Sequence, residues 1–240
     1  MSRAAAHEIA PGLYRIPTAP WDLLNSYAIV EADGRVTLVD AGLKRSARRI
    51  TAALRSIGSA PSEVTRIVMT HAHPDHAGGL AALERETGAP VGAHADDAGA
   101  LRAGRTPARD RSTFGGRLLD RLPGGGFTPS DVAEEFSDGQ VLDIGGGLEV
   151  VHTPGHSPGH VALLHLASRT LITGDSIFNV RGLRWPPASF CTDFRLTKQT
   201  ATRLAELEYT AAAFTHGPEI TDDPREAIRG FLRRQGVRIE

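Results

Sequence analysis

The sequence contains a single cysteine, Cys191, so the chain cannot form an intrachain disulfide. Aromatic residues make up only 5% of it, and no hydrophobic run is long enough for a membrane span or a secretory signal. Neither sign of charge dominates, because 27 Lys and Arg residues are balanced by 28 Asp and Glu residues. From these absences we expect a cytoplasmic protein that binds neither nucleic acid nor a membrane.

The remaining composition is that of an ordinary globular protein. The chain has 240 residues, of which 40% are hydrophobic and 23% are charged. This length predicts a single domain over residues 1–240, with a small molecule as its partner. Assembly of identical chains is also compatible with the sequence. Residues from about 104 to 130 are rich in Gly, Pro and Arg, and we expect a loop or insertion there, with one helical turn near "GGRLLDRL".

Short apolar runs alternate with segments of helical spacing along the chain. Strands are predicted at residues 12–17, 25–31, 35–40, 64–70, 90–94, 140–144, 148–153, 161–166, 170–174 and 211–216. Helices are predicted at residues 46–58, 78–88, 196–208 and 223–236. This order of elements favours two sheets packed together with helices outside them.

Metal-ligand side chains crowd into the stretch "THAHPDH", directly after the apolar run "VTRIVMT". His71, His73, Asp75 and His76 lie within six residues. Burying so many unpaired imidazole and carboxylate groups would be costly. The pattern therefore predicts a metal site at the end of a strand.

Three later strands also end in residues of this kind. His156 follows "LEVVHT", Asp175 follows "TLITG", and His216 follows "AAAFT". Strand ends at one edge of a sandwich lie close together, so all of these side chains can converge. The resulting set of five imidazoles and two carboxylates suits zinc, iron or manganese, and its imidazole content favours zinc. Seven ligands are too many for one tetrahedral metal, so we expect two ions that share a carboxylate.

The motifs "THAHPDHAGG", "TPGHSPGH", "TGDSIF" and "FTHGPEI" resemble, in their order, those of the metallo-β-lactamase-fold hydrolases. The resemblance runs from about Asp40 to Gly217. It implies an α+β fold, a four-layer αββα sandwich of two mixed sheets with helices on the outer faces. One metal ion would bind His71, His73 and His156, and the other would bind Asp75, His76 and His216. Asp175 would bridge the two ions, and Asp40 would support the ligands by hydrogen bonding.

The same resemblance implies a hydrolase in which a hydroxide bridges the two metal ions. Asp75 would be the catalytic residue that orients this hydroxide and then moves its proton. The ligand set is similar to that of glyoxalase II and the lactonases. We therefore expect cleavage of a thioester, a lactone or a related ester.

Three alternatives stay open at this point. A mono-iron sulfur dioxygenase of the same fold shares the HxHxDH spacing, and one iron per chain would identify it. A true β-lactamase is disfavoured, because the family's β-lactamases lack the aspartate that Asp175 supplies. A non-catalytic binding module would be expected to have lost at least one ligand.

Several other residues receive weaker predictions. His94, His152 and His165 are interpreted as structural or solvated, and Cys191 as a small side chain in a loop. His160 is interpreted as a hydrogen-bonded structural histidine, with a role in supporting the ligands as the alternative. Trp185 and Phe190, in "GLRWPPASFC", either wall a substrate pocket or pack on the sheets. The arginines of residues 104–129, together with Arg181 and Arg184, are candidate cationic groups for a substrate.

Overall fold

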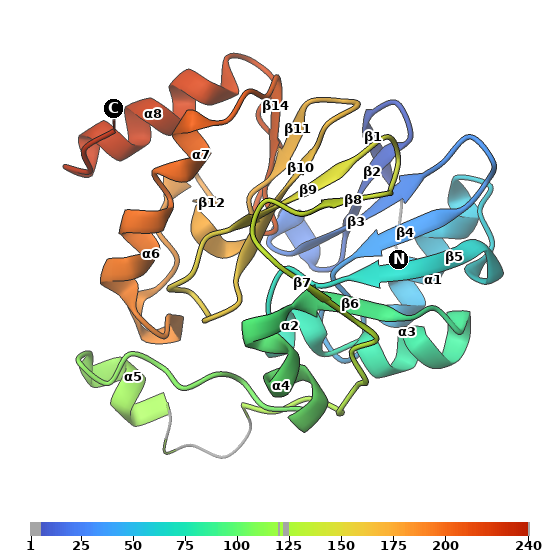
Figure 1. Ribbon diagram of the computed structural model, residues 1–240, viewed down its shortest axis with the longest axis horizontal. Helices are drawn as coiled ribbons and strands as arrows, with labels where there is room; N and C mark the ends of the chain where they lie inside the picture. The colour runs from blue at the N-terminus through green and yellow to red at the C-terminus, as the bar shows by residue number, and fades with distance from the viewer. Residues whose placement is uncertain (1–5, 120, 122–124, 240) are drawn as a thin grey trace.

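Two β-sheets face each other at the centre of the molecule, and helices cover both outer faces (Figure 1). The structure, a computed structural model, describes residues 6–119, 121 and 125–239. The predicted α+β class and the four-layer αββα arrangement are confirmed. Within the described part of the chain, every helix is too short or too polar to cross a lipid bilayer.

The first sheet has seven strands in the order β1-β2-β3-β4-β5-β6-β7. Its strands are β1 (His7–Ala10), β2 (Leu13–Pro17), β3 (Asn25–Val30), β4 (Val36–Val39), β5 (Val64–Val68), β6 (Val91–His94) and β7 (Glu134–Phe136). Neighbouring strands are antiparallel from β1 to β4 and parallel from β4 to β7. The sheet is therefore mixed, as predicted.

The second sheet has five strands in the order β14-β11-β10-β9-β8. Its strands are β8 (Val141–Leu142), β9 (Leu148–His152), β10 (Val161–His165), β11 (Thr170–Ile172) and β14 (Ala211–Ala213). Only β11 and β14 pair in parallel among these strands. Both β9 and β11 are antiparallel to β10, so β9, β11 and β14 end at the same edge of the sheet.

The helices divide between the two outer faces (Figure 1). They are α1 (Ala47–Ser56), α2 (Pro74–Ala77), α3 (Leu80–Thr87), α4 (Ala95–Ala103), α5 (Phe114–Leu119), α6 (Phe194–Thr200), α7 (Arg203–Glu206) and α8 (Pro224–Arg234). Side chains of α1, α3 and α4 share a hydrophobic cluster with the first sheet. Residues on and beside α7 and α8 share another cluster with the second sheet.

Strand alternation builds the core between these layers. On β10, Val161 and Leu163 face the cluster between the sheets, whereas Ala162 and Leu164 face the helices. A strand that is buried on both faces needs apolar residues at consecutive positions. This requirement explains why "VALLHL" reads as a continuous apolar run.

Some elements differ from those expected from the sequence. Strands β1 and β7, helix α4, and the hairpin of β12 (Phe178–Asn179) and β13 (Leu183–Arg184) were not predicted. The single helix predicted over residues 196–208 is divided into α6 and α7, because the chain turns at Ala201 and Thr202. The helical turn predicted near "GGRLLDRL" is present as α5, although residues 120 and 122 of that stretch lie outside the described residues.

Candidate metal centre

The strand ends that the sequence singled out meet at one edge of the sandwich. His71 and His73 follow β5, and His156 follows β9 on the facing sheet. Asp175 and His216 follow β11 and β14, respectively. Pro74 begins the short helix α2 directly after His73, and this turn brings Asp75 and His76 back toward the other side chains. All seven side chains predicted as ligands lie in two adjoining groups.

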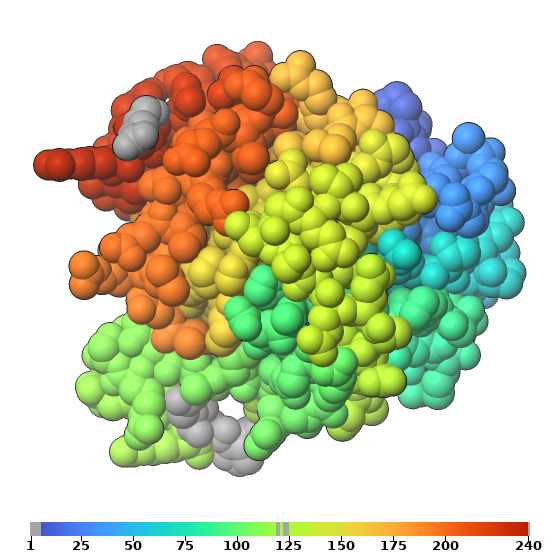
Figure 2. Space-filling view, in the orientation of Figure 1, coloured from blue at the N-terminus to red at the C-terminus, as the bar shows by residue number. Residues whose placement is uncertain are grey.

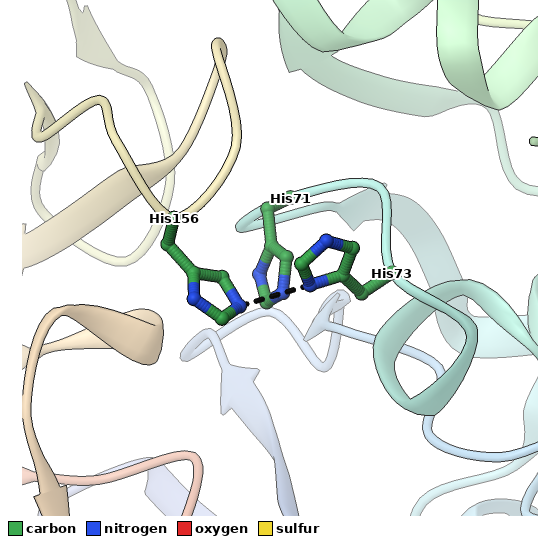
Figure 3. Close-up of side chains that lie close together, drawn as sticks. All are labelled: His71, His73 and His156. Carbon is green, nitrogen blue, oxygen red and sulfur yellow. Dashed lines mark hydrogen bonds between the residues drawn. The ribbon is translucent and has the colours of Figure 1, made fainter. Parts of the chain in front are cut away.

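The first group consists of His71, His73 and His156, all of which are buried. Figure 3 shows the three imidazole rings turned toward one another, from two different loops. Nδ1 of His73 lies 2.9 Å from Nε2 of His156. One candidate nitrogen from each ring lies within 4.8 Å of the other two. The three rings therefore offer a compact set of nitrogen donors.

The second group consists of Asp75, His76, Asp175 and His216. Oδ1 of Asp175 lies 3.3 Å from Nε2 of His76, and Oδ2 lies 3.4 Å from Nε2 of His216. The same Oδ2 atom is 3.2 Å from Nε2 of His156, which belongs to the first group. The Asp175 carboxylate thus reaches both groups, which is the geometry that a shared ligand requires.

Buried imidazole nitrogens without hydrogen-bond partners indicate whether these residues fit a metal ion. The Nε2 atoms of His71, His76 and His216 are buried and have no hydrogen-bond partner. Buried polar atoms normally have partners, so these three need an explanation. A divalent cation supplies one, because a neutral imidazole nitrogen is a common ligand for zinc and related metals. The donor set therefore fits divalent metal ions.

The electrostatics of the site depend on burial and on its carboxylates. Burial lowers the pKa of His156 and His216, but the nearby carboxylate of Asp175 outweighs it and raises both pKa values to about 9. Burial likewise opposes ionisation of Asp175, yet the imidazoles of His216, His76 and His156 hold its pKa well below the usual range. The metal-free site is therefore a network of carboxylates and protonated imidazoles, in which cations stabilise the buried anions.

Asp40, which follows β4, orients two of the rings from behind. Its carboxylate accepts hydrogen bonds from Nδ1 of His76 at 2.8 Å and from the hydroxyl group of Thr70 at 2.8 Å. The Thr70 oxygen is in turn 3.0 Å from Nδ1 of His71. With Nδ1 engaged in this way, both rings keep Nε2 directed into the site. Asp40 has a φ of 61°, a left-handed conformation that few residues other than glycine adopt.

His160 lies directly behind Asp175 and supports this ligand, which is the alternative role predicted for it from the sequence. Its Nε2 atom accepts a hydrogen bond from the backbone N–H of Asp175 at 2.7 Å. Burial and the neighbouring His156 lower the pKa of His160 to about 3, so the ring stays neutral and can accept. Gly174 leaves room for this ring, because a Cβ atom there would collide with it.

Asp97 is a supporting residue that the sequence reasoning missed. Its buried carboxylate accepts hydrogen bonds from the N–H of Ala72, the hydroxyl of Ser157 and the N–H of Gly159. These partners lie on the two loops that carry His73 and His156, so Asp97 ties the loops together. The helix that presents it, α4, was itself unpredicted. Two acidic residues at the start of "ADDAGALRAG" and a glycine at its end were the available signal.

Other singled-out residues lie around the site or away from it. Sγ of Cys191 is 3.5 Å from Nδ1 of His156, so this cysteine contacts a candidate ligand. Trp185 packs its ring against Phe231 of α8, with 4.8 Å between ring centroids, while Phe190 is exposed.

The segment around α5 lies beside α6 (Figure 2). It is bound there by the Asp110 carboxylate, which accepts a hydrogen bond from the N–H of Phe194.

The sequence of this chain is similar to those of known proteins. A sequence profile of the metallo-beta-lactamase superfamily matches residues 19–216. The probable metallo-hydrolase YflN of Bacillus subtilis is 27% identical over 201 residues, covering 77% of this chain and 76% of the relative. The acyl-coenzyme A thioesterase MBLAC2 of Gallus gallus is 29% identical over 193 residues, covering 75% and 66%, respectively.

Solved structures agree with this relationship. The crystal structure of the metallo-beta-lactamase family protein TTHA1429 from Thermus thermophilus superimposes with a TM-score of 0.75 at 26% identity, and the match covers 95% of this chain and 81% of that one. The profile match extends over most of the chain and ends at His216, the last of the predicted ligands. The chain therefore belongs to the metallo-beta-lactamase superfamily and is a metal-dependent hydrolase.

Proposed function

We propose that this hydrolase uses two divalent metal ions, with zinc preferred over iron or manganese, to cleave a thioester, lactone or related ester in a small molecule. The observation that carries the proposal is the position of Asp175. One carboxylate oxygen lies 3.3 Å from His76 Nε2 and the other lies 3.2 Å from His156 Nε2. A carboxylate that reaches both groups supports a pair of ions rather than a single one.

The proposed ligands are the seven residues of the two groups. His71, His73 and His156 would hold one ion, and Asp75, His76 and His216 would hold the other, with Asp175 between them. Two such ions, when bound, lower the pKa of a shared water and polarise a carbonyl oxygen. The hydrogen bonds that Asp40 accepts from His76 and that His160 accepts from Asp175 keep the ligands oriented before any ion arrives.

Asp75 is the proposed catalytic residue. Its side chain is 38% exposed, whereas that of Asp175 is only 3% exposed. Burial opposes ionisation of Asp75, but His76 and His216 outweigh it and hold the pKa of this carboxyl well below its usual value. Asp75 is therefore an anion at neutral pH. Its partly exposed position, rather than its pKa, supports a role in orienting a water molecule toward a bound carbonyl group and in taking up its proton.

A groove beside His216 supports the choice of substrate class. It has a volume of about 560 Å³, which suits a small organic ligand. Its walls combine apolar side chains with two arginines, and they are formed by Trp21, Leu23, Asn179, Val180, Arg181, Arg184, Gly217 and Pro218. Nδ1 of His216 donates to the carbonyl of Leu23 at 2.7 Å, so the groove adjoins the site directly.

This lining favours an acyl compound that carries an anionic group. Trp21 is 87% exposed and has a left-handed backbone, with φ 55° and ψ 31°. A large apolar ring held exposed in such a conformation is typical of a binding surface rather than of a core. Arg181 and Arg184 add the positive charge that a carboxylate or phosphate would pair with. The thioesterase activity named for MBLAC2 is compatible with a substrate of this kind.

Two measurements test the proposed function. Purified protein should contain close to two metal ions per chain, and removal by a chelator should abolish hydrolysis, with activity restored by Zn²⁺. A panel of thioesters, lactones, phosphoesters and β-lactams should then give its highest kcat/KM with a thioester or lactone. One iron per chain with oxygen consumption would favour the sulfur dioxygenase alternative instead.

Asp175→Ala tests the bridging role separately. Because the variant removes a carboxylate that contacts both groups, we expect both ions to bind more weakly, and dialysed protein to lose most of its metal. Asp143→Ala, on the loop between β8 and β9, is a matched control that should keep its ions. Full metal content in Asp175→Ala would disprove the bridge.

A further inference from the structure

A third cluster of metal-ligand side chains lies outside the candidate centre. His94 ends β6 of the first sheet, His152 ends β9 of the second sheet, and Asp96 lies in the first turn of α4. A candidate donor atom from each residue lies within 4.8 Å of the other two. Both histidines were predicted to be structural or solvated. Nothing in the proposed hydrolysis uses any of the three side chains.

We propose that His94, Asp96 and His152 form an accessory binding site for a divalent transition-metal ion of the zinc class. Two imidazoles and one carboxylate are a donor set that zinc uses in proteins, with a further position left for water. The site would be separate from the seven ligands of the hydrolytic centre. It would also join the two sheets, since each contributes one histidine.

The spacing of the donors is close to what such an ion requires. Oδ2 of Asp96 lies 3.7 Å from Nδ1 of His94 and 3.9 Å from Nε2 of His152. Ligand atoms about 2.1 Å from a tetrahedral ion are about 3.4 Å from one another. These two carboxylate–nitrogen distances must therefore shorten by a few tenths of an ångström. Asp96 can provide this movement, because its side chain is 58% exposed.

The two imidazoles also need a small rearrangement. Their rings are stacked, with centroids 3.9 Å apart and an interplanar angle of 15°. Parallel rings cannot both direct an in-plane lone pair at one ion, so one ring must turn. His152 is the ring with room to do so, because 21% of its side chain is exposed, compared with 8% for His94. Nδ1 of His94 accepts a 3.3 Å hydrogen bond from the N–H of Asp96, which the ion would displace while His152 and Asp96 close around it.

The environment of His94 suits metal binding. Burial and the adjacent His152 ring lower the pKa of His94, which keeps this imidazole in the neutral form that binds metals. Nε2 of His152 donates to the carbonyl of Pro158 at 2.8 Å. On binding, the ring takes its other tautomer: the proton moves from Nε2 to Nδ1, and Nε2 becomes free to bind the ion. A water molecule on the ion can then donate to Pro158.

An ion at this position would stiffen the support of the hydrolytic centre. Asp97 immediately follows Asp96, and its carboxylate holds Ala72 and Ser157 on the two ligand-bearing loops. His152 lies four residues before His156 on the same strand-to-loop connection. Fixing Asp96 and His152 to His94 would therefore restrain both loops. We expect the occupied site to raise the melting temperature of the protein.

The experiment compares Zn²⁺ binding to the metal-loaded full chain and to three variants. Asp96→Asn and His152→Gln each remove one proposed ligand from an exposed or partly exposed position, so both should fold. His7→Gln is the matched control, because His7 is an exposed histidine of β1 outside the cluster. Calorimetric titration with Zn²⁺ should reveal one additional site in the wild-type chain and in His7→Gln. Its affinity should fall at least about tenfold in the two ligand variants.

Because the experiment compares the wild-type chain with its variants, its outcome does not depend on how many ions the hydrolytic centre holds or on which substrate that centre hydrolyses. Excess Zn²⁺ should also raise the melting temperature of the wild-type chain and His7→Gln more than that of Asp96→Asn. Equal Zn²⁺ binding by all four proteins would overturn the proposal, as would a titration with no additional site in the wild-type chain.

Discussion

Oδ2 of Asp40 accepts a hydrogen bond of 2.8 Å from Nδ1 of His76, on the side of the ring that faces away from the candidate metal centre. The opposite nitrogen, Nε2, is buried without a hydrogen-bond partner and points toward Asp175. A carboxylate behind an imidazole fixes both its tautomer and its direction. The ligand is thus oriented by residues from a different strand before any ion binds.

Asp40→Asn should weaken metal binding without removing a ligand. The amide keeps the size of the side chain but loses the negative charge that holds Nδ1–H of His76 and the Thr70 hydroxyl. We expect zinc affinity, measured by competition with a chelator, to fall about 10- to 100-fold. Asp33→Asn, in the exposed turn between β3 and β4, is the control. If the two variants bound zinc equally well, Asp40 would have only a local structural role.

Asp75→Asn should reduce turnover more than substrate binding. The substitution preserves shape, but an amide cannot accept the proton that the carboxylate would take. We expect kcat to fall about 100-fold or more, while KM changes only a few-fold. Metal content must be measured on the same sample, because Asp75 is also a proposed ligand. Unchanged kcat in fully loaded protein would exclude Asp75 as the catalytic residue.

The metal-free protein should lose stability as the pH rises above neutrality. His156 and His216 have folded-state pKa values of about 9, above the value near 6.5 expected in the unfolded chain. Protonated imidazoles therefore stabilise the metal-free fold below about pH 6.5, and this contribution disappears as the pH rises through 9. Thermal melts in the presence of a chelator should show the melting temperature falling between pH 6.5 and 9.5.

The affinity of the protein for zinc should instead increase as the pH rises over the same range. Because protons compete with the ion for these imidazoles, zinc affinity should rise with pH, and binding at pH 7 should release protons. Titration in buffers of different ionisation enthalpy measures that release. A metal-free melting temperature that stayed constant with pH, together with no proton release, would contradict the assigned pKa shifts.

The layers and the ligand-bearing edge could be predicted from sequence because both depend on local patterns. Apolar runs such as "VTRIVMT" identify buried strands, and the His or Asp that follows four of these runs identifies the edge. The seven side chains converge because β5 of the first sheet ends at the same edge of the sandwich as β9, β11 and β14 of the second. Which residues stand behind the ligands is a matter of three-dimensional packing. Asp40 was found through the family resemblance, whereas Asp97 lay on an unpredicted helix.

The residues that line the groove could be predicted only in part, because three-dimensional packing also brings them together. Arg181 and Arg184 were candidates because they closely follow Asp175 in sequence, and both line the groove. Trp185, their neighbour, points instead toward α8 and donates from Nε1 to Gln235 at 3.2 Å. The aromatic wall comes from Trp21, which is distant in sequence. Its loop is held near His216 because the carbonyl of Asp22 accepts from the N–H of Gly217 at 2.8 Å.

Because Trp21 lines the groove and Trp185 does not, substitutions of the two residues should have different effects. Trp21→Ala should raise KM for the preferred acyl substrate about tenfold, because it removes an exposed aromatic wall of the groove. Arg184→Gln should raise KM for substrates that carry a carboxylate or phosphate, and should have little effect on neutral esters of the same acyl group. Neither change touches a proposed ligand, so metal content should stay at the wild-type level.

Trp185→Phe provides the matched control for these variants. Its ring packs on Phe231 in the hydrophobic cluster under α8, so we expect a lower melting temperature and an unchanged KM. The contrast between the two tryptophans separates recognition from packing. If Trp185→Phe raised KM while Trp21→Ala did not, the substrate would bind on the α8 side of the β12–β13 hairpin, and the groove beside His216 would have no part in recognition.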